Sequence, residues 1–301
     1  MQIHLRRFIV KRVQRKCKGK WPILIGSEKI PDKWNGWPGG KEFALVITHD
    51  VEKKKGYERV LNLMEMEKEL SFVSSFNFVP ERDYIVEKKL LETLKANGFE
   101  VGVHGLHHDG KLFSSEQEFL NRAKKINQYL KDWNTVGFRA PAMHHNLDWI
   151  GELDIEYDLS TFDTDPFEPQ SDGIGTIFPF WVERKRKKNS GYVELPYTLP
   201  QDFTLFVLMK EQSPHIWIDK LDWIAENGGM ALVNVHPDYL NFENKYSIEE
   251  FPVRLYIEFL DYVKSNYQGK FWQALPKQVT KFIKTLRQDT ITLNKRNNTR
   301  F

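Results

Sequence analysis

Ionisable side chains follow four apolar segments of this sequence, each of which has the length of a β-strand. They are His49, Asp50 and Glu52 after FALVIT, His104, His107, His108 and Asp109 after FEVGV, Arg139 after TVGF, and His236 and Asp238 after MALVNV. Functional residues of a parallel barrel lie at the carboxyl ends of its strands, so these groups are expected to share one rim. Carboxylates and imidazoles at one rim can move protons or bind a cation.

The types of these residues suit a catalytic metal site. Two imidazoles and one carboxylate leave a coordination position open for water, as in catalytic zinc and related divalent sites. His104 and His108 can reach one ion if the chain turns as it leaves its strand, and the Asp50-Val51-Glu52 segment offers carboxylates from another strand. The lone cysteine, Cys17, excludes an intrachain disulfide framework and any Cys-x-x-Cys site.

Alternating strand and helix patterns surround these residues. Strands are expected at 43–50, 71–79, 99–105, 135–141, 157–163, 175–182 and 229–237, and helices at 57–70, 87–98, 114–130, 214–226, 250–266 and 276–287. Repeated βα units predict a parallel sheet, and their span suits a distorted barrel of seven or eight (β/α) units. The sequence therefore predicts an α/β protein whose barrel covers residues 43–289.

Segments of different character flank the expected barrel. Residues 1–20 carry eight Lys or Arg and no acidic residue, and Leu5, Ile9 and Val13 recur at helical spacing. This basic amphipathic helix either packs on the body with its charges in solvent or rests on an anionic membrane face. Residues 29–42 are expected to form a Trp/Pro/Gly-rich loop that completes an N-terminal extension, 1–42, and residues 290–301 a polar tail.

Composition narrows the class of protein. The 301 residues are 41% hydrophobic and 14% aromatic, which excludes global disorder. The formal charge of +3 gives no reason to expect nucleic acid as a partner. No apolar run approaches the roughly 20 residues of a membrane span, and the N-terminus lacks the apolar core of a secretory signal. We expect a cytoplasmic protein, with membrane contact, if any, through residues 1–20 at the inner face.

Four short motifs, in order, resemble those of the polysaccharide deacetylases of the NodB-homology type, carbohydrate esterase family 4. Thr48-His49-Asp50-Val51-Glu52 matches the family's first acidic motif, and His104 and His108 match its His-x-x-x-His motif. Arg139-Ala140-Pro141 matches its Arg-x-Pro motif, and the strand ending in His236 matches its late histidine motif. The acidic residue that the family contributes from mid-domain matches Asp163 or Asp165.

The resemblance implies a role for each matched residue. Asp50 would be the general base, Arg139 would pair with it, and His236 would protonate the departing amine. Asp163 or Asp165 would hold the imidazole of His236. Glu52, His104 and His108 would bind a divalent ion, with zinc the expected metal. The chain departs from the family at Glu52, where Asp is usual, and at Gly105, where Ser or Thr is usual.

Several of these residues could instead have a purely structural role. Asp50 could cap a helix, Glu52 could be a solvated loop residue, and His49 could pack beneath the site or line it. For the remaining rim residues we favour loop roles: His107, Asp109, His144 and His145. The basic run 184–188 is expected to be a solvated loop, with attraction of an anionic substrate as the alternative.

Aromatic residues suggest how a sugar would be held, because sugar rings stack their C–H faces on aromatic side chains. We expect His49, Pro141, Trp181 and Tyr197 to contact substrate, with the segment 192–197 as a cleft wall. The predicted function is hydrolytic removal of acetyl groups from an N-acetylated, less commonly O-acetylated, sugar. The alternatives are hydrolysis of another C–N bond in a small metabolite, and a glycan-binding or assembly protein that has lost catalysis.

Overall fold

A curled, mainly parallel sheet forms the centre of the protein. The computed structural model describes residues 2–17, 21–32, 34–187, 189–243 and 247–298. Its strands are β1 (Phe43–Val51), β2 (Ser75–Phe78), β3 (Glu100–His104), β4 (Gly137–Arg139), β5 (Tyr157–Asp158), β6 (Phe180–Glu183), β7 (Gly191–Glu194), β8 (Met230–Asn234), β9 (Leu240–Asn241), β10 (Phe251–Pro252) and β11 (Phe271–Gln273).

The long strand β1 organises the sheet. It pairs in parallel with β8 along one side, and with β11 and then β2 along the other. The sheet continues through β3, β4, β5 and β7, all parallel, and ends with the antiparallel strand β6. Toward β8 it closes only through isolated contacts, such as the hydrogen bond from Leu199 N to Leu232 O (3.1 Å). The predicted distorted (β/α) barrel is confirmed.

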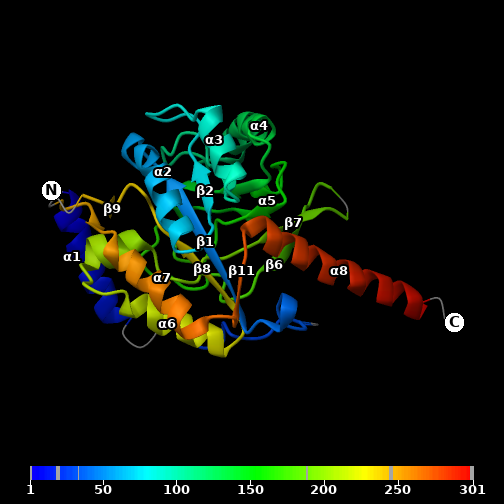
Figure 1. Ribbon diagram of the computed structural model, residues 1–301. Coiled ribbons are helices and arrows are strands. Elements are labelled where there is room, and N and C mark those ends of the chain that lie inside the picture. Colours follow the sequence, from blue (N-terminus) through cyan, green and yellow to red (C-terminus); the bar gives the residue numbers. More distant parts are fainter. Residues whose placement is uncertain (1, 18–20, 33, 188, 244–246, 299–301) are drawn as a thin grey trace.

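Helices surround the curled sheet (Figure 1). They are α1 (Gln2–Lys16), α2 (Lys54–Glu69), α3 (Lys88–Ala96), α4 (Glu116–Asp132), α5 (Leu147–Ile150), α6 (His215–Glu226), α7 (Arg254–Tyr267) and α8 (Pro276–Asn298), with three short helical turns η1 (Pro38–Gly40), η2 (Pro141–Met143) and η3 (Phe203–Met209). In the described part of the chain, no helix combines the length and apolar character needed to cross a bilayer.

Side-chain alternation along β1 separates the two apolar environments. Ala44 and Val46 pack inside the barrel, whereas Leu45 and Ile47 pack under the helices. Successive side chains of a strand point to opposite faces, so this period of two continues into the polar end of β1. Asp50 therefore lies on the barrel side.

Three segments differ from the sequence-based expectation. Part of the expected cleft wall at 192–197 is strand β7, whose Tyr192 and Val193 are fully buried between β5 and β6. The apolar run 203–209 forms the π-helical turn η3, and helix α8 continues to Asn298 rather than ending near residue 287.

Residues 184–187 of the basic run lie in the hairpin between β6 and β7, and Lys188 lies outside the described residues. Lys185, Arg186 and Lys187 pair with acidic side chains of neighbouring elements, and Arg184 donates to the carbonyls of Leu153 and Ile155. These cations are already matched by protein groups, as expected for a solvated surface loop.

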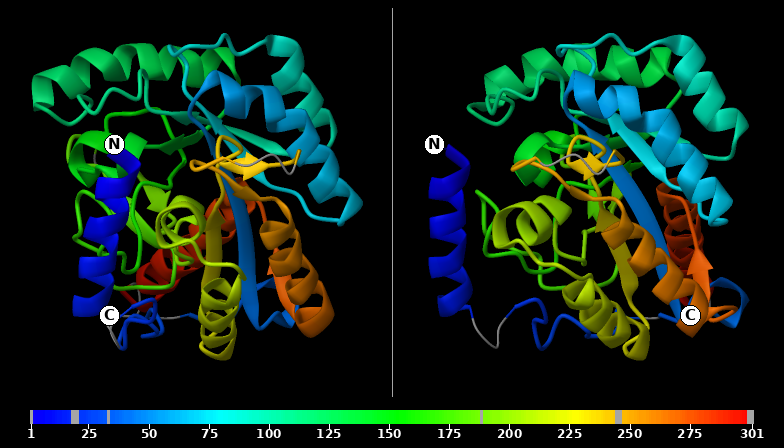
Figure 2. Two further views of the ribbon diagram at one scale, coloured as in Figure 1. Left: turned by 90° about the vertical axis from the view of Figure 1, so that its left-hand side faces the viewer. Right: turned by 60° about the vertical axis from the view of Figure 1, so that its left-hand side comes forward.

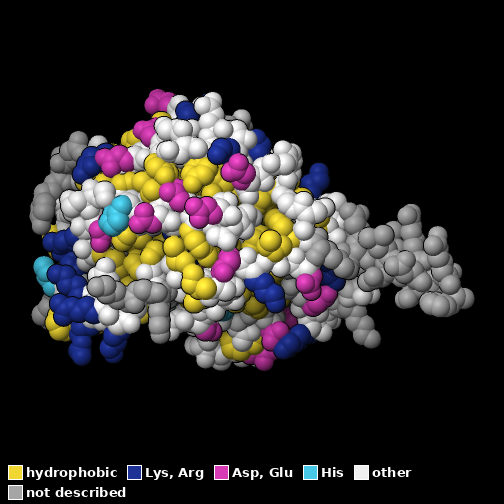
Figure 3. All heavy atoms as spheres, turned by 90° about the horizontal axis from the view of Figure 1, so that it is seen from below, with side chains coloured by type: hydrophobic (Ala, Val, Ile, Leu, Met, Phe, Trp, Pro, Cys, Tyr) yellow, Lys and Arg dark blue, Asp and Glu magenta, His cyan; other side chains and the backbone are white. Residues whose placement is uncertain are grey.

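Helix α1 packs alongside the body (Figure 2). Its residues Ile3 and Val10 are buried against the body, and its main neighbour there is η3. Lys and Arg side chains gather at the edge of the molecule where α1 lies (Figure 3). The helix is therefore docked through one face. This agrees with the first interpretation of the sequence, in which the helix packs on the body with its charges in solvent.

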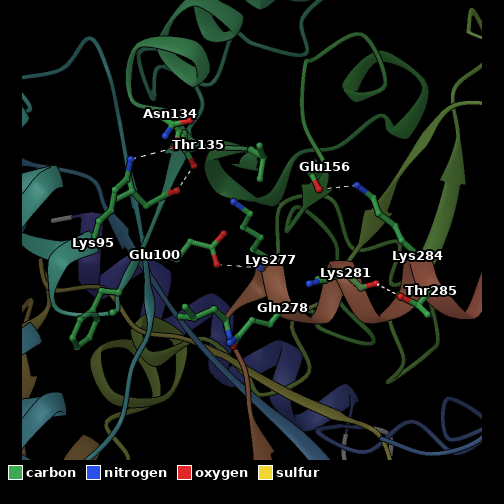
Figure 4. Close-up of a pocket in the computed structure, with 15 residues that line it drawn as sticks. Lys95, Glu100, Asn134, Thr135, Glu156, Lys277, Gln278, Lys281, Lys284 and Thr285 are labelled. Atoms are coloured by element: carbon green, nitrogen blue, oxygen red, sulfur yellow. Dashed lines mark hydrogen bonds and ion pairs between the residues drawn. The ribbon is translucent and has the colours of Figure 1, made fainter. Parts of the chain in front are cut away.

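A cavity of about 770 Å³ opens at the amino-terminal ends of β3, β4 and β5, next to the start of α8 (Figure 4). Glu100 lies in it and accepts hydrogen bonds from the Tyr157 hydroxyl (2.8 Å) and the Lys277 amide (3.1 Å). Burial is the main cause that raises the pKa of Glu100 to about 7. This cavity lies at the opposite end of the strands from the expected catalytic rim.

We predict that Glu100→Gln changes how stability depends on pH. The pKa of Glu100 is raised from its usual 4.5 to about 7 in the folded protein, so its stabilising contribution is present below pH 4.5 and is lost as pH rises through 7. Relative to the variant, the wild type should lose about 1–3 kcal/mol of unfolding free energy across this window. Urea unfolding of both proteins from pH 4.5 to 8 measures this difference, and parallel curves would contradict it.

Candidate active site

A cleft of about 450 Å³ lies at the carboxyl-terminal end of the barrel strands. Its lining comes from eight parts of the chain: Arg6, Ile9 and Val10; Glu52 and Lys53; Arg82; His108; Ala142; Phe167, Glu168 and Pro169; Gln201, Phe203, Thr204 and Leu208; His236 and Tyr239. Its volume is in the usual range of small-molecule sites, roughly 300–1,000 Å³. The expected convergence of strand ends is therefore present.

Glu52, His104 and His108 form a cluster with the composition of a metal site. One ligand atom of each lies within 4.8 Å of the others. The nearest pair is His108 Nε2 and Glu52 Oε1, 2.9 Å apart. A carboxylate with two imidazoles is a common donor set for zinc and other divalent ions that keep an open position.

The orientation of His104 fits a ligand role. Its Nδ1 lies 3.1 Å from the carbonyl oxygen of Arg139, which fixes that nitrogen as the N–H donor. Its Nε2 is buried and has no hydrogen-bond partner among the described residues. Burial lowers the pKa of His104 to about 4, so its ring is neutral near pH 7. An unpartnered, unprotonated nitrogen facing a carboxylate and a second imidazole is what a metal ion would require.

Asp50 lies beside this cluster at the end of β1. Its Oδ1 accepts from Asn77 Nδ2 (3.0 Å) and Arg139 Nη1 (3.3 Å), and its Oδ2 accepts from Asn234 Nδ2 (2.9 Å). Burial alone would raise the pKa of Asp50, but the charges of Arg139 and two nearby histidines hold it well below its usual range. Asp50 is therefore an oriented, ionised carboxylate.

His236 faces Asp50 and Glu52 from the loop after β8. Its Nε2 lies 4.0 Å from Asp50 Oδ2 and 3.9 Å from Glu52 Oε1. Its Nδ1 lies 2.7 Å from Oδ1 of Asp202, whose Oδ2 accepts from the His236 amide at 2.7 Å. Burial would lower the pKa of His236, but the Asp202 carboxylate outweighs it and raises that pKa to about 10. The imidazole is therefore positioned and protonated.

The expected partner of His236 was wrong. Asp163 instead pairs with Lys220 Nζ at 2.5 Å, and both side chains are buried. Asp165 accepts from the Tyr197 hydroxyl at 2.9 Å. Asp202 takes the position because it directly precedes η3 and the tertiary fold brings it against the backbone and ring of His236.

Three of the four expected substrate contacts lie away from the cleft. His49 faces the helices, with Nε2 2.8 Å from Glu67 Oε1, because it directly precedes Asp50 in β1 and so points to the opposite face of the strand. Trp181 lies on a separate surface groove, where the Arg287 guanidinium covers its ring. Tyr197 is buried and reaches the cleft only through Glu168, which accepts from its hydroxyl at 2.8 Å.

Pro141 and the remaining rim histidines shape the loops. Pro141 lies with His108 and His144 around a small hollow beside the cleft. His107 Nδ1 lies near the carbonyl of Glu81, and Asp109 pairs with Arg122. His145 Nδ1 lies 2.9 Å from the carbonyl of Met143. The contacts of His107, Asp109 and His145 agree with the loop roles expected for them, whereas Pro141, expected to contact substrate, lies beside the cleft and not in its lining.

Five polar residues that the sequence analysis did not single out as part of the site also contribute to it: Asn77, Asp202, Asn234, Glu168 and Tyr239. The Tyr239 hydroxyl donates to Glu52 Oε2 at 3.0 Å, so it orients the carboxylate that faces His108. Asn234 ends the otherwise apolar strand β8 and Asn77 lies between two phenylalanines of β2, which is the one sequence signal that could have identified them.

Solved structures resemble this architecture, whereas no protein-family model and no curated protein matches the sequence. A protein of Mycobacterium smegmatis described as a candidate polysaccharide deacetylase matches with a TM-score of 0.62 and 17% identity, over 84% of this chain and 93% of that chain. The chitin deacetylase of the fungal pathogen Colletotrichum lindemuthianum matches with a TM-score of 0.50 and 13% identity, over 83% and 92%. The chain has the polysaccharide deacetylase fold.

Within this deacetylase fold, the departure at Gly105 has a local cause. Gly105 has φ +63°, and a Cβ there would lie 2.4 Å from Pro141 Cγ. Both the left-handed backbone and the contact exclude a larger side chain without rearrangement. Gly105 therefore permits the tight turn that brings His108 back toward His104.

We predict that the cluster binds one divalent cation and that His104→Gln abolishes this binding. The reason is that the substitution removes the buried Nε2 aimed into the cluster. His107→Gln is the matched control, because His107 is directed to Glu81 instead. Plasma mass spectrometry and titration calorimetry with Zn²⁺ after chelator treatment measure the stoichiometry. Equal binding by both variants would place the metal elsewhere.

Proposed function

We propose that this protein is a metal-dependent deacetylase that hydrolyses the N-acetyl group of a sugar or glycan intermediate. The observation that carries the proposal is the meeting of three units at one cleft: the Glu52/His104/His108 cluster, the Asp50–Arg139 pair and the Asp202–His236 pair. The deacetylase fold supports it. The cytoplasmic location expected from the sequence stays a prediction.

Glu52, His104 and His108 would hold the cation, for which Zn²⁺ is the first choice. When bound, such an ion lowers the pKa of a coordinated water and polarises the acetyl carbonyl. The longer Glu side chain suits this place because Tyr239 and His108 already hold its two oxygens on the cleft side. Glu52 itself is kept ionised, since the neighbouring histidines outweigh burial and lower its pKa.

Asp50 would act as the general base. Amide hydrolysis consumes one water, whose oxygen adds to the acetyl carbon while a proton leaves it. Asp50 Oδ2 is the oxygen nearer to His236 and takes a single hydrogen bond from Asn234, so it is the one free to accept that proton. Arg139 and Asn77 hold the other oxygen and fix the plane of the carboxylate.

His236 would act as the general acid. The C–N bond breaks only if the nitrogen leaves as a neutral amine, which requires a proton donor. His236 Nε2–H faces the cleft while Asp202 holds the opposite nitrogen. The products are acetate and the free amino sugar. This need for an acid favours an N-acetyl over an O-acetyl substrate, whose leaving alcohol depends less on protonation.

We predict that the purified protein releases acetate from N-acetylated sugars, that chelation abolishes release and that Zn²⁺ restores it. Asp50→Asn should lower kcat by about 10²- to 10⁴-fold, because the proton acceptor is lost. Asp109→Asn is the matched control, since Asp109 is engaged by Arg122 at the surface. An enzymatic acetate assay over acetylated mono- and oligosaccharides measures both.

Two other outcomes would replace this proposal. Release of another amine or acid from cyclic amides, without acetate release from any sugar, would identify a hydrolase of small metabolites. Sugar binding by a protein that holds no metal and turns over no substrate would identify a glycan-binding protein.

We predict that Asp202→Asn lowers kcat about 100-fold with little change in KM. The reason is that Asp202 orients His236 and keeps it protonated but does not line the cleft. Steady-state kinetics on the substrate found by the acetate assay separates kcat from KM.

Asp163→Asn provides the comparison, since the sequence analysis expected Asp163 or Asp165 in this role. Asp163 pairs with buried Lys220, so its replacement should lower the melting temperature while kcat is retained. A loss of kcat in Asp163→Asn, with full activity in Asp202→Asn, would reverse the assignment.

A further inference from the structure

Helix α1 is a fixed part of the cleft wall. Ile3 and Val10 are buried, and the Arg7 guanidinium donates to the carbonyls of Val207 (3.0 Å) and Ile248 (2.8 Å). From this docked position Arg6, Ile9 and Val10 line the cleft that holds His236. Whatever contacts the outer face of α1 is therefore next to the catalytic groups.

The outer face of α1 combines apolar and cationic side chains. Leu5, Phe8 and Ile9 are exposed by 61%, 59% and 50%, and they are three of the eight large apolar residues exposed in the described chain. Around them on the same face are Arg12, Arg15 and Lys16, all exposed, and the described residues of α1 include no acid. The Arg12 guanidinium lies 5.9 Å from the centre of the Phe8 ring. Figure 3 shows this concentration of positive charge at the α1 edge.

This composition suits an anionic lipid surface. Helices that lie in the membrane interface place Leu and Phe among the acyl chains and Lys and Arg at the lipid phosphates. A solvent-exposed helix face gains nothing from exposed Leu and Phe, whereas a bilayer removes their surface from water. An acidic polymer such as nucleic acid would use the cations and leave the apolar side chains uncovered.

The cleft continues the same charge pattern inward. Arg6 lies at its α1 side, and Lys53 and Arg82 contribute from the body. Of the two glutamates that line it, Glu168 has its pKa raised to about 8, mainly by burial, so it adds little negative charge near pH 7. A substrate that carries phosphate near its sugar is matched by these cations.

We propose that the outer face of α1 binds an anionic bilayer and presents the cleft to an acetylated sugar attached to a lipid of that membrane through phosphate. This proposal rests on the proposed deacetylase function for the chemistry, but the membrane contact stands on α1 alone. The sugar would enter between α1 and the catalytic rim while its lipid stays in the bilayer.

Vesicle flotation of the full chain tests the membrane contact. The protein should float with vesicles of phosphatidylcholine and phosphatidylglycerol, remain behind with phosphatidylcholine alone, and lose binding as salt rises. Reversing three charges (Arg12→Glu, Arg15→Glu, Lys16→Glu) should weaken binding at least about 10-fold, and Leu5→Gln with Phe8→Gln should do the same. The control reverses Lys88, Lys89 and Lys124, which are exposed on α3 and α4.

Three results of these binding experiments would contradict the proposed membrane contact. The first is that the wild type does not float with anionic vesicles. The second is that the control variant loses as much binding as the α1 variants, and the third is that the protein binds duplex DNA more tightly than the vesicles. Melting curves confirm that every variant is folded, and none of the changed residues lines the cleft.

A second measurement separates this proposal from the proposed function. Acetate release is compared for N-acetylglucosamine linked through phosphate to a lipid in the anionic vesicles and for the same sugar phosphate in solution. The charge-reversed α1 variant should lose rate only on the vesicle substrate, by about 10-fold or more. Equal rates of wild type and variant on vesicles would overturn the membrane-held substrate while leaving the deacetylase intact. Flotation without any acetate release would support the membrane contact and contradict the proposed deacetylase function.

Discussion

The buried ion pair of Asp50 and Arg139 is the constraint on which the site depends. Both side chains are buried, so each depends on the other and on further hydrogen bonds to remain charged. Thr48 and Asn234 accept from Arg139, and Asn77 and Asn234 donate to Asp50. These residues come from β1, β2, β4 and β8, so satisfying one carboxylate fixes four strands in register.

The rest of the site follows from strand alternation. Glu52 follows Asp50 by two residues just after β1, and His236 follows Asn234 by two residues just after β8, so each pair is directed to the same side. A shift of one residue in either strand would exchange these groups for His49 or Val235 and bury the wrong partners. The same two-residue alternation therefore directs apolar side chains into the barrel and the polar side chains of the candidate site to its rim.

The sequence predicted the barrel and the shared rim because fully apolar strands followed by charged residues allow few arrangements, whereas the pairing of Asp50 with Arg139 came from the family resemblance. It did not predict Asp202, which stands before an apolar run that forms the π-helical turn η3, an element without a periodic signature. It also offered His49 and Trp181 as contacts, because proximity in sequence to a rim does not say which way a side chain points. Asp202 reaches His236, and Glu168 reaches the cleft, through long-range packing that composition and spacing do not record.

Asp238 adds a consequence for how the centre holds its shape. Its carboxylate accepts from the amides of Glu52, Lys53 and Gly56, and a Cβ at Gly56 would lie 2.3 Å from that carboxylate. Asp238 is only two residues beyond His236. The backbone that carries Glu52 is thus held to the backbone that carries His236, so small movements of the incompletely closed barrel would shift both side chains together instead of pulling them apart.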